Sequence, residues 1–335
     1  MRAHVLHKYA KTNAALTFED RAEPALGPGE VRIGVEAVAL NPVDLKTRDG
    51  EPKVVLPVAP PFVLGSDLAG HVVEIGGDVR SLRVGDPVYA YAGMDRMGAF
   101  AERVTLPAER VARRPKGSSA EEAACLPLPG LCALQALDAG AVGAGSRVLI
   151  HGGVGGVGGV AVQLASQRGA EVFATVGTAD MDRARALGVS HPIDYRTQRF
   201  EDVVRDMDFV FDTVGGDTLR RTWRVIRPGG TVASLHLPPP VEALVAAGMR
   251  APWLLRMLMP LVTRGPRSAA AKARARLVPI LSVPSAEGLE RVTRAAERPG
   301  LRVTVDKVFP FDALGAAFDY LQSGAAKGRV VLKRA

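Results

Sequence analysis

Residues 147–164 read RVLIHGGVGGVGGVAVQL, a short apolar run followed by a glycine cluster and an apolar helical pattern. Gly153, Gly155 and Gly158 have the spacing G-x-G-x-x-G. Glycines at this spacing allow a tight strand-to-helix turn, a close approach of the backbone to a pyrophosphate, and close packing of the helix on the strand. The helix N-terminus then directs free N–H groups and a positive dipole end at the phosphates. The stretch therefore predicts a dinucleotide site.

The sequence around the glycine cluster supports this prediction, because glycine-rich turns alone are common. The helical pattern ends at Gly169, and residues 171–176 have the apolar pattern of a second strand. Together they predict a strand–loop–helix–strand unit of about 30 residues, which is the context that the motif requires. The expected cofactor contacts in the loop and the first helical turn are Gly153, Gly155, Gly156, Val157 and Gly158.

The end of the second strand indicates which dinucleotide binds. An NAD site usually has Asp or Glu there, about 20 residues after the glycines, to bind the ribose 2′-OH. Here residues 175–178 read TVGT, and the first acid is Asp180. Small and hydroxyl residues leave room for a 2′-phosphate, so we predict NADP(H) rather than NAD(H). The expected contacts are Thr175, Gly177, Thr178 and Arg183, with Arg185 and Arg196 as further basic residues nearby.

A chain of 335 residues can form a large core and two domains. The first ~120 residues alternate short apolar segments with turn clusters and are predicted to be β-rich. From residue 147 strands and helices alternate, which predicts a doubly wound parallel sheet in an α/β protein. A strand, helix and strand after Gly300 are expected to return to the first domain. We therefore expect a β-rich catalytic domain at 1–122 and 301–335, and a cofactor domain at 123–300 with the cofactor in the cleft between them.

Particular elements are also predicted. The pattern is expected to be helical from about Ser119, through Cys125, to Ala139, and a helix would place Cys125 and Cys132 on one side as free buried thiols, which fits a reducing cytoplasm. The expected strands of the parallel sheet are 148–150, 171–175, 209–212, 231–235 and 276–283. The helices between them are expected at 158–167, 180–187, 200–205 and 217–225.

Composition and charge restrict the possible partners. The net charge is +8, but basic and acidic residues are mostly interspersed. The densest basic run, 264–276, has no interleaved aromatic residues, so a solvated helix face is favoured over a nucleic-acid patch. The N-terminus continues directly into a strand-like segment, and no signal peptide is expected. The longest apolar run, around 253–262, is too short to span a bilayer. We expect a cytoplasmic protein without a nucleic-acid or membrane partner.

Several further motifs occur in a fixed order along the chain. They are 41–46, 65–70, 84–89, 98–102, 126–130, the glycine loop, 193–195, 211–216, 228–230 and 327–332. Together they resemble the zinc-free quinone oxidoreductase (zeta-crystallin-like) branch of the medium-chain dehydrogenase/reductase superfamily. The resemblance implies a Rossmann domain with a GroES-like catalytic domain, hydride transfer from NADPH to a quinone or an α,β-unsaturated carbonyl, and a homodimer.

Residue types also indicate whether the chain can bind a catalytic zinc ion. A catalytic zinc site needs three side-chain ligands. Zinc-dependent relatives place Cys near Asp44 and Gly-His-Glu where this chain has Gly65-Ser66-Asp67, so Ser66 replaces the ligating His. Two cysteines and six scattered histidines form no cluster at the usual ligand spacing. We predict that no metal is bound.

The resemblance also implies cofactor contacts outside the glycine loop. Asn41 is expected near the nicotinamide, and Leu126 is expected to line the cleft. Tyr195 matches a tyrosine that reaches the 2′-phosphate in relatives; the alternative is an ordinary surface tyrosine. Lys327 is expected to contact the cofactor; the alternative is an ordinary exposed cation. The remaining expected contacts are Thr213, Val214, Leu235, Leu237 and Arg329.

Hydride transfer to an activated C=C bond builds negative charge on the carbonyl oxygen, which the protein must stabilise and allow to be protonated. Several relatives carry a tyrosine soon after the Asn-Pro-Val-Asp motif, but residues 45–50 contain none. Lys46 is the substitute that we predict, with an exposed cation as the alternative. Tyr91 is a second candidate, and water is compatible with quinone reduction. Asp44 is expected to anchor its own loop by local hydrogen bonds.

Two questions remain open at the level of sequence. Residues 236–274 exceed the short linker of minimal relatives, and their apolar residues fit a lid, an extension of the core or a subunit contact. The function also has alternatives. An enoyl-thioester reductase would share every motif and add a basic entry for its substrate arm, and a cofactor-binding recognition protein would show little turnover.

Overall fold

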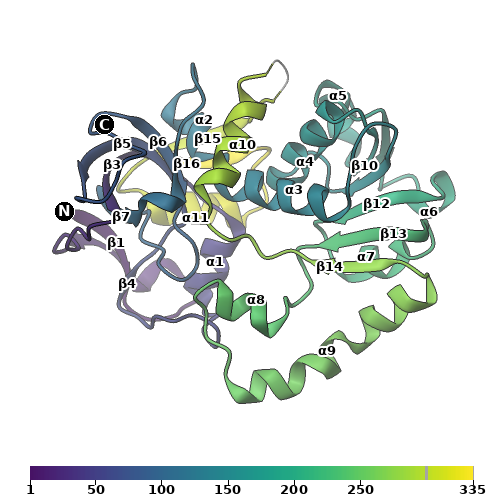
Figure 1. Cartoon of the computed structure of the whole chain (residues 1–335), viewed down its shortest axis with the longest axis horizontal. Helices are drawn as coiled ribbons and strands as arrows, with labels where there is room; N and C mark the ends of the chain where they lie inside the picture. Colours follow the sequence, from purple (N-terminus) through teal and green to yellow (C-terminus); the bar gives the residue numbers. More distant parts are fainter. Residues whose placement is uncertain (299–300, 335) are drawn as a thin grey trace.

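The computed structural model describes residues 1–298 and 301–334, so the domain boundary expected at residue 300 lies outside the described residues. Figure 1 shows a β-rich lobe, an α/β lobe, and a long helix that extends below both. The chain crosses between the lobes more than once. The C-terminal strand β16 (Arg329–Lys333) pairs antiparallel with the N-terminal strand β3 (Glu30–Ala39), Val331 lying opposite Ala39. The last strand of the chain therefore belongs to the sheet of the N-terminal lobe.

The β-rich lobe contains a seven-stranded sheet in the order β15–β16–β3–β5–β6–β8, with β7 paired to β3, and a second sheet in the order β2–β1–β4. Its other strands are β1 (Arg2–Leu6), β2 (Leu16–Asp20), β4 (Phe62–Val63), β5 (Asp67–Ile75), β6 (Pro87–Tyr91), β7 (Arg103–Pro107), β8 (Val111–Arg113) and β15 (Val305–Pro310). Its helices are α1 (Pro42–Asp49), α2 (Ala120–Ala124) and α11 (Leu314–Gln322), with short 3-10 turns η1 (Asn13–Ala15) and η2 (Ala108–Arg110).

The α/β lobe confirms the doubly wound parallel sheet. Its strands lie in the order β11–β10–β9–β12–β13–β14, all parallel, which is the order of two mononucleotide-binding halves. They are β9 (Arg147–His151), β10 (Glu171–Val176), β11 (His191–Asp194), β12 (Met207–Asp212), β13 (Ile226–Ser234) and β14 (Arg276–Pro279). Its helices are α3 (Pro127–Ala139), α4 (Gly156–Gln167), α5 (Met181–Ala186), α6 (Phe200–Val203), α7 (Gly216–Thr222), α8 (Val241–Ala246), α9 (Trp253–Lys272) and α10 (Ala286–Ala296), with η3 (Thr178–Asp180) before α5.

Three details differ from expectation. Strand β11 was not predicted, because Pro192 breaks its apolar pattern; a proline is tolerated in an edge strand. The strand expected over 276–283 ends at Pro279, where the chain leaves the sheet towards α10. The single helix expected around both cysteines is wrong. Cys125 caps the end of α2, and α3 begins only at Pro127.

Both thiols are nevertheless free and buried, as expected. Burial raises the pKa of Cys125 to about 11 and that of Cys132 to about 12, so both remain protonated and unreactive at neutral pH.

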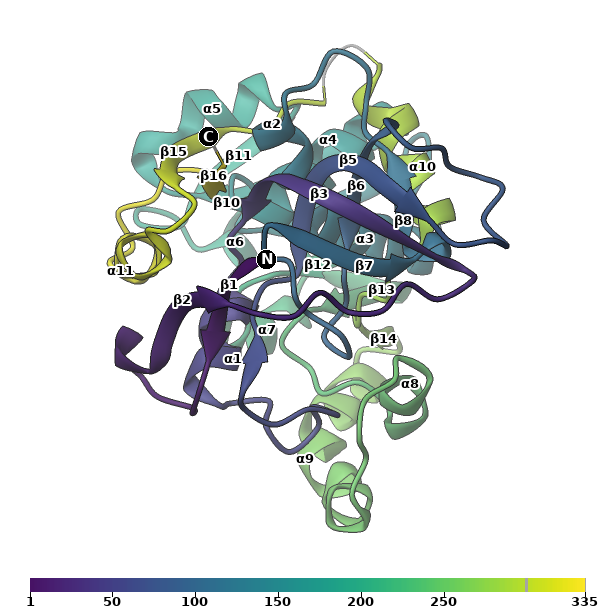
Figure 2. The ribbon, with the colours of Figure 1, turned by 90° about the vertical axis from the view of Figure 1, so that its left-hand side faces the viewer.

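The lobes are joined through α3 and α10, which pack between the sheets. Figure 2 shows β3, β5 and β6 crossing in front of α3. Leu289 and Val292 of α10 are completely buried, and Tyr89 of β6 donates a 2.6 Å hydrogen bond to the Leu289 carbonyl. Full burial of a leucine or valine side chain contributes about 1.5–3 kcal/mol, so these contacts hold the two lobes together.

The segment after β13 forms α8 and α9. The large apolar side chains on α9 are exposed, Trp253 to 70% and Leu261 to 66%, so a core role for them is wrong. None of the helices within residues 1–298 and 301–334 is long and apolar enough to cross a membrane.

Candidate cofactor site

The glycine loop connects β9 to α4. Its tight turn is made by Gly152, which has φ +69° and lies outside the G-x-G-x-x-G triplet. A Cβ on Gly153 would lie 2.5 Å from the Cβ of Ala174 on β10, and a Cβ on Gly158 would overlap the carbonyl oxygen of Gly152. Gly153 and Gly158 are therefore required for close packing. Gly155, the N-cap of α4, remains exposed at the tip of the loop.

The first turn of α4 can bind an anion. The N–H groups of Gly156, Val157 and Gly158 have no acceptor within the helix, because they belong to its first turn. These groups and the positive end of the helix dipole lie at one place, where negative charge is stabilised. Gly156 is exposed, so the backbone there is accessible.

Neighbouring strands hold the loop in place. The Thr175 hydroxyl accepts a 3.2 Å hydrogen bond from the Gly152 N–H, so this buried side chain supports the loop from below. Thr213, after β12, donates a 2.7 Å hydrogen bond to the His151 carbonyl. The two threonines, both expected as cofactor contacts, are thus placed on either side of the end of β9.

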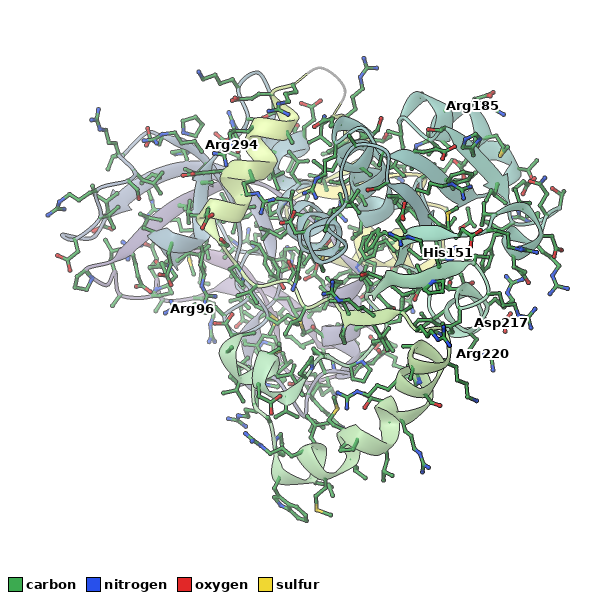
Figure 3. All side chains as sticks on the ribbon, turned by 45° about the vertical axis from the view of Figure 1, so that its right-hand side comes forward. Arg96, His151, Arg185, Asp217, Arg220 and Arg294 are labelled. Atoms are coloured by element: carbon green, nitrogen blue, oxygen red, sulfur yellow. The ribbon has the colours of Figure 1, made fainter. Side chains whose placement is uncertain are left out.

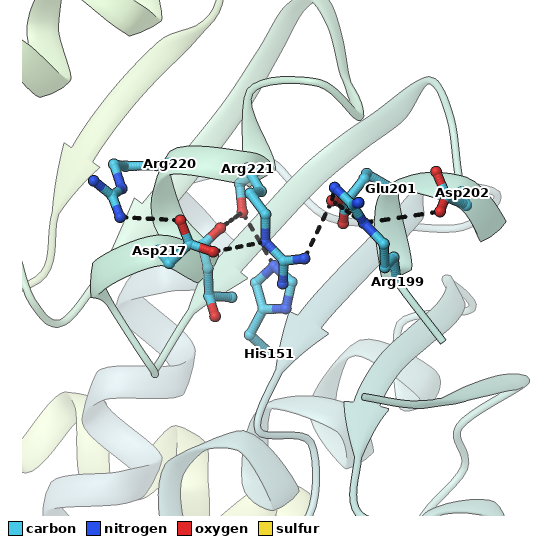
Figure 4. Close-up of polar contacts among 9 residues, drawn as sticks. His151, Arg199, Glu201, Asp202, Asp217, Arg220 and Arg221 are labelled. Atoms are coloured by element: carbon cyan, nitrogen blue, oxygen red, sulfur yellow. Dashed lines mark hydrogen bonds and ion pairs between the residues drawn. The ribbon is translucent and has the colours of Figure 1, made fainter. Parts of the chain in front are cut away.

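His151 lies under the loop as a structural group. Its ring contacts the hydroxyls of Thr175 and Thr222 at 3.2 and 3.1 Å. Figure 3 shows it inside the α/β lobe, and Figure 4 shows it beside Arg221, which forms ion pairs with Glu201 and Asp217. Burial lowers the pKa of His151 to about 4, so the ring is neutral at pH 7 and ties β9 to β10 and α7.

Arg329, at the start of β16, reaches the glycine loop from the β-rich lobe. One terminal nitrogen, Nη1, lies 3.1 Å from the position that a Cβ on Gly156 would occupy. The other, Nη2, donates a 2.9 Å hydrogen bond to Asn41 Oδ1 and lies 3.5 Å from Asp67 Oδ2. Its Nε is buried without a hydrogen-bond partner in the described structure. The guanidinium therefore connects the β-rich lobe to the N-terminus of α4 and has donor capacity left over.

Two buried carboxyl groups complete this cluster. Asp44 accepts hydrogen bonds from the Asn41 N–H at 2.7 Å and from the Ser66 hydroxyl at 3.1 Å, which confirms that it anchors its own loop. Asp67 accepts from Asn41 Nδ2 at 3.0 Å and from the Leu128 N–H at 2.9 Å. Burial raises the pKa of each carboxyl to about 7, while the nearby Arg329 charge opposes that rise.

The two candidate proton donors lie in different surroundings. Lys46 is exposed on α1, whose N-cap is Asn41. Tyr91 ends β6 directly opposite Asp67 of β5 and is 3% exposed, and burial raises its pKa well above 10. Leu126, expected to line the cleft, is buried in the core between α2 and α3.

The ends of β10 and β11 bring together a second group of expected residues. Thr178 donates a 2.7 Å hydrogen bond to Asp194 Oδ2. The Tyr195 hydroxyl lies 3.8 Å from the Cβ position of Gly177, and the Arg196 guanidinium lies 5.7 Å from the centre of the Tyr195 ring. Arg183 points elsewhere, since it donates to the carbonyl of Lys327.

The remaining expected contacts follow β12 and β13. Val214 is half exposed after β12, and the buried Asp212 accepts from its N–H at 3.2 Å. Leu235 is partly buried just after β13, whereas Leu237 is buried beside the cavity under α9. Lys327 is exposed, so the structure brings its carbonyl rather than its side chain into the cluster.

The contacts of Ser66 and Asp67 do not follow from the sequence motif that contains them. A usable signal was present at Asp67, a carboxylate in a mostly apolar stretch whose nearest Lys or Arg residues in sequence are Lys53 and Arg80. Buried carboxylates need a cation or several donors, which predicts a distant arginine. Within residues 1–298 and 301–334, no group of three or more His, Cys, Asp or Glu side chains could hold a metal ion.

Two protein-family profiles match the chain, the alcohol dehydrogenase GroES-like domain over residues 27–116 and the zinc-binding dehydrogenase over residues 187–332. A 2-methylene-furan-3-one reductase of Solanum lycopersicum is 30% identical over 345 residues, which cover 99% of this chain and 79% of the relative. The NADPH-dependent alkenal/one oxidoreductase of Arabidopsis thaliana, a chloroplastic protein, is 30% identical with the same coverage.

The chain belongs to the quinone oxidoreductase-like family of medium-chain dehydrogenases/reductases. The quinone oxidoreductase of Coxiella burnetii has the same fold, with a TM-score of 0.83 at 28% identity over 99% of both chains. Membership of this family confirms the resemblance found in the motifs and the combination of a Rossmann sheet with a GroES-like lobe.

Proposed function

We propose that the protein is an NADPH-dependent reductase that transfers hydride to a quinone or an α,β-unsaturated carbonyl without a metal. The observation that carries this proposal is the junction of the first turn of α4 with Arg329 and the buried Asn41–Asp67 cluster. The names of the relatives, an enone reductase and an NADPH-dependent alkenal/one oxidoreductase, support the same reaction class.

The residues at this junction fit a pyrophosphate. The N–H groups of Gly156, Val157 and Gly158 would bind its oxygens, and Arg329 Nη1 would provide a charge-assisted donor beside Gly156. The absence of a side chain at Gly155 and Gly156 keeps this surface open.

The 2′-phosphate of NADP(H) is proposed to bind at the end of β10. No carboxylate occupies residues 175–178 to repel it. The Tyr195 hydroxyl and Asp180 Oδ2 lie 3.8 and 3.7 Å from the Cβ position of Gly177, and Arg196 lies over the Tyr195 ring, so a basic residue must offset the Asp180 charge there. Arg196 replaces Arg183 as the proposed cation because Arg183 is engaged by the Lys327 carbonyl. Gly177→Asp should weaken NADPH binding about tenfold or more and leave NADH binding less affected, because a carboxylate repels the phosphate. Gly177→Ala is the control.

A bound nicotinamide would supply the hydride. In this chain, the amide of Asn41 is fixed by Arg329 and Asp67 and is proposed to position the nicotinamide side of the cleft. Lys46 remains the proposed donor to the developing oxyanion, because it is exposed and charged. Tyr91 is enclosed by protein and is proposed to hold Asp67 in place, with water delivering the proton.

The reaction is proposed to need no zinc. Ser66, at the position of a ligating histidine in zinc-dependent relatives, uses its hydroxyl to bind Asp44. The Arg329 cation already lies beside Asp67, so a divalent ion there would meet positive charge. Elemental analysis is expected to find a zinc-to-chain ratio far below one, and a chelator should leave the rate of NADPH oxidation unchanged.

NADPH oxidation against one ortho-quinone, one para-quinone, one enal, one enone and one enoyl-CoA tests the proposal. Turnover with a quinone or enone supports it, and turnover confined to enoyl-CoA would identify an enoyl-thioester reductase instead. Tight NADPH binding without turnover on the whole panel would contradict the reductase assignment.

Lys46→Met separates a chemical from a structural role of that lysine. A donor to the oxyanion should lower kcat while the KM for NADPH stays within about twofold.

We also propose that the protein is cytoplasmic and forms a homodimer through an outer strand of the parallel sheet, β11 or β14. Sedimentation would test whether the chain is a dimer.

A further inference from the structure

Helix α9 presents its apolar face away from the protein. Six large apolar side chains, spaced as one helical face, are all 45–70% exposed: Trp253, Leu254, Met257, Leu258, Leu261 and Val262. The other side of α9, including Met259, Thr263 and Pro266, lines a cavity of about 320 Å³ against β14 and the start of α8. An ordinary surface helix has the opposite arrangement, with its apolar face against the core.

The same segment carries nearly all of the net charge. We define the arm as residues 250–276, which contain α9. The arm holds seven basic residues and no acid, and no Asp or Glu occurs anywhere between Glu242 and Glu287, although the whole chain has a net charge of +8. The seven are exposed: Arg250, Arg256, Arg264, Arg267, Lys272, Arg274 and Arg276. The arm is therefore a local cationic surface on an otherwise nearly neutral protein.

The arm is attached at both ends. The Arg250 N–H donates a 2.7 Å hydrogen bond to the Val55 carbonyl in the β-rich lobe, and the Gly229 N–H donates a 2.8 Å hydrogen bond to the Arg274 carbonyl in the α/β lobe. Figures 1 and 2 show α9 held below both lobes between these points. The helix therefore presents a fixed apolar face on the outside of the molecule.

Charge decides what can cover this face. A second copy of the chain placed face to face would bring two such cationic arms together without a single acid from either, which like-charge repulsion opposes, although Arg256 and Arg267 lie on the cavity side of each helix. An anionic lipid surface meets both requirements, because its interface accepts Trp, Leu and Met side chains and its headgroups attract Arg and Lys. We propose that the arm binds peripherally to an anionic membrane, with α9 lying in the plane of the interface.

This proposal differs from the expectation, drawn from sequence, of no membrane partner. The apolar run 253–262 is too short to span a bilayer, but an interfacial helix only needs one apolar face and flanking basic residues. The sequence alone also fits a core helix. The exposure of that face, which only the structure shows, separates the two.

Vesicle flotation tests the proposal directly. The full chain is mixed with phosphatidylcholine vesicles or with phosphatidylcholine vesicles that contain phosphatidylglycerol, at low and at high salt. We expect binding to the anionic vesicles about tenfold or more above the neutral ones, reduced by high salt. Equal binding to both vesicle types, or none to either, would overturn the proposal.

Trp253 provides a reporter of insertion. The chain has two tryptophans, and Trp223 is partly buried beside the core. In Trp223→Phe, emission comes from Trp253 alone and should shift to shorter wavelength on anionic vesicles. An unshifted spectrum in the bound state would contradict insertion of α9.

Matched variants locate the contact. Leu261→Ser and the pair Arg264→Glu with Lys272→Glu should each lower vesicle binding about tenfold. Val84→Ser, 62% exposed in the β-rich lobe, and Lys116→Glu, exposed before α2, should leave it unchanged.

Sedimentation of the same variants tests whether a second copy of the chain covers the apolar face instead. If the unmodified chain is a dimer and Leu261→Ser dissociates it, a second copy covers the face and the proposal fails. None of these measurements requires turnover, so they stand apart from the reductase proposal.

Discussion

Arg329 is 7% exposed and contacts an amide and a carboxylate, whereas the basic side chains of the arm face solvent on a segment without any acid. The first arrangement is costly to disturb, because a buried charge without its partner is strongly unfavourable. The second contributes little to folding, because exposed charges are screened by water and salt. The comparison indicates that Arg329 supports the fold beside its proposed role in cofactor binding, and that the arm is available for an external partner.

Removal of Arg329 should have the largest effect. In Arg329→Met the carboxyl of Asp67 loses its cation, and we expect the free energy of unfolding to fall by about 3–5 kcal/mol. Denaturant unfolding measures it, with the exposed Arg185→Met as the control, expected within about 0.5 kcal/mol.

The double variant Arg329→Met with Asp67→Asn separates folding from binding. It should recover much of the stability, because no unpaired charge is left, but not the affinity for NADPH. Recovery of both would show that Arg329 has no direct role at the pyrophosphate.

The buried carboxyls make stability depend on pH. Their pKa of about 7 lies above the unfolded value of about 3.9, so the folded state binds more protons between about pH 4 and 7. Their contribution is therefore present at low pH and is lost as pH rises towards 7, by up to about 1.4 kcal/mol per pH unit for each carboxyl. Unfolding at about pH 5 and pH 7 should show this loss, and Asp44→Asn should halve it; an unchanged slope would exclude Asp44 as its source.

A smaller effect is expected at the glycine loop. A Cβ on Gly158 would overlap the Gly152 carbonyl, so Gly158→Ala should displace the loop, cost about 1–3 kcal/mol and weaken NADPH binding. Gly143→Ala, with no atom within 4 Å of its added Cβ, is the matched control. Isothermal titration with NADPH and thermal unfolding would distinguish the two, and equal behaviour would contradict the packing argument.

The smallest effect is expected in the arm. Leu261→Ser should change the free energy of unfolding by less than about 0.5 kcal/mol, because the side chain is 66% exposed. Leu289→Ala, at a completely buried position, should cost about 2–5 kcal/mol. A large loss from Leu261→Ser would mean that the arm belongs to the folding core and would remove the contrast with Arg329.

The sequence predicts the parallel sheet and the glycine loop well, because both depend on local patterns: apolar runs of strand length, and glycines at a fixed spacing. It does not identify Gly152 as the residue with positive φ, since four of the five residues at 152–156 are glycine. The helix expected across both cysteines failed because Pro127 begins a new helix, a boundary that periodicity alone does not show.

The contacts around Arg329 are harder to predict from the sequence. Asn41, Asp67 and Arg329 are distant in the chain, and the pairing of both β5 and β16 with β3 brings them together. The motif resemblance gives each residue separately but not their contacts. The arm is the reverse case, since its composition is obvious in sequence while the direction of its apolar face requires the structure.

The pairing of β3 with β16 also has a consequence in time. Ala39 and its partner Val331 are about 290 residues apart in the chain. At roughly 5–20 residues per second, a ribosome makes the second strand about 15–60 s after the first. Throughout that interval residues 37–39 of β3 have backbone N–H and C=O groups without their final partners, and such an edge can pair with other chains. The order of synthesis therefore leaves the end of β3 unpaired until the last strand of the chain has been made.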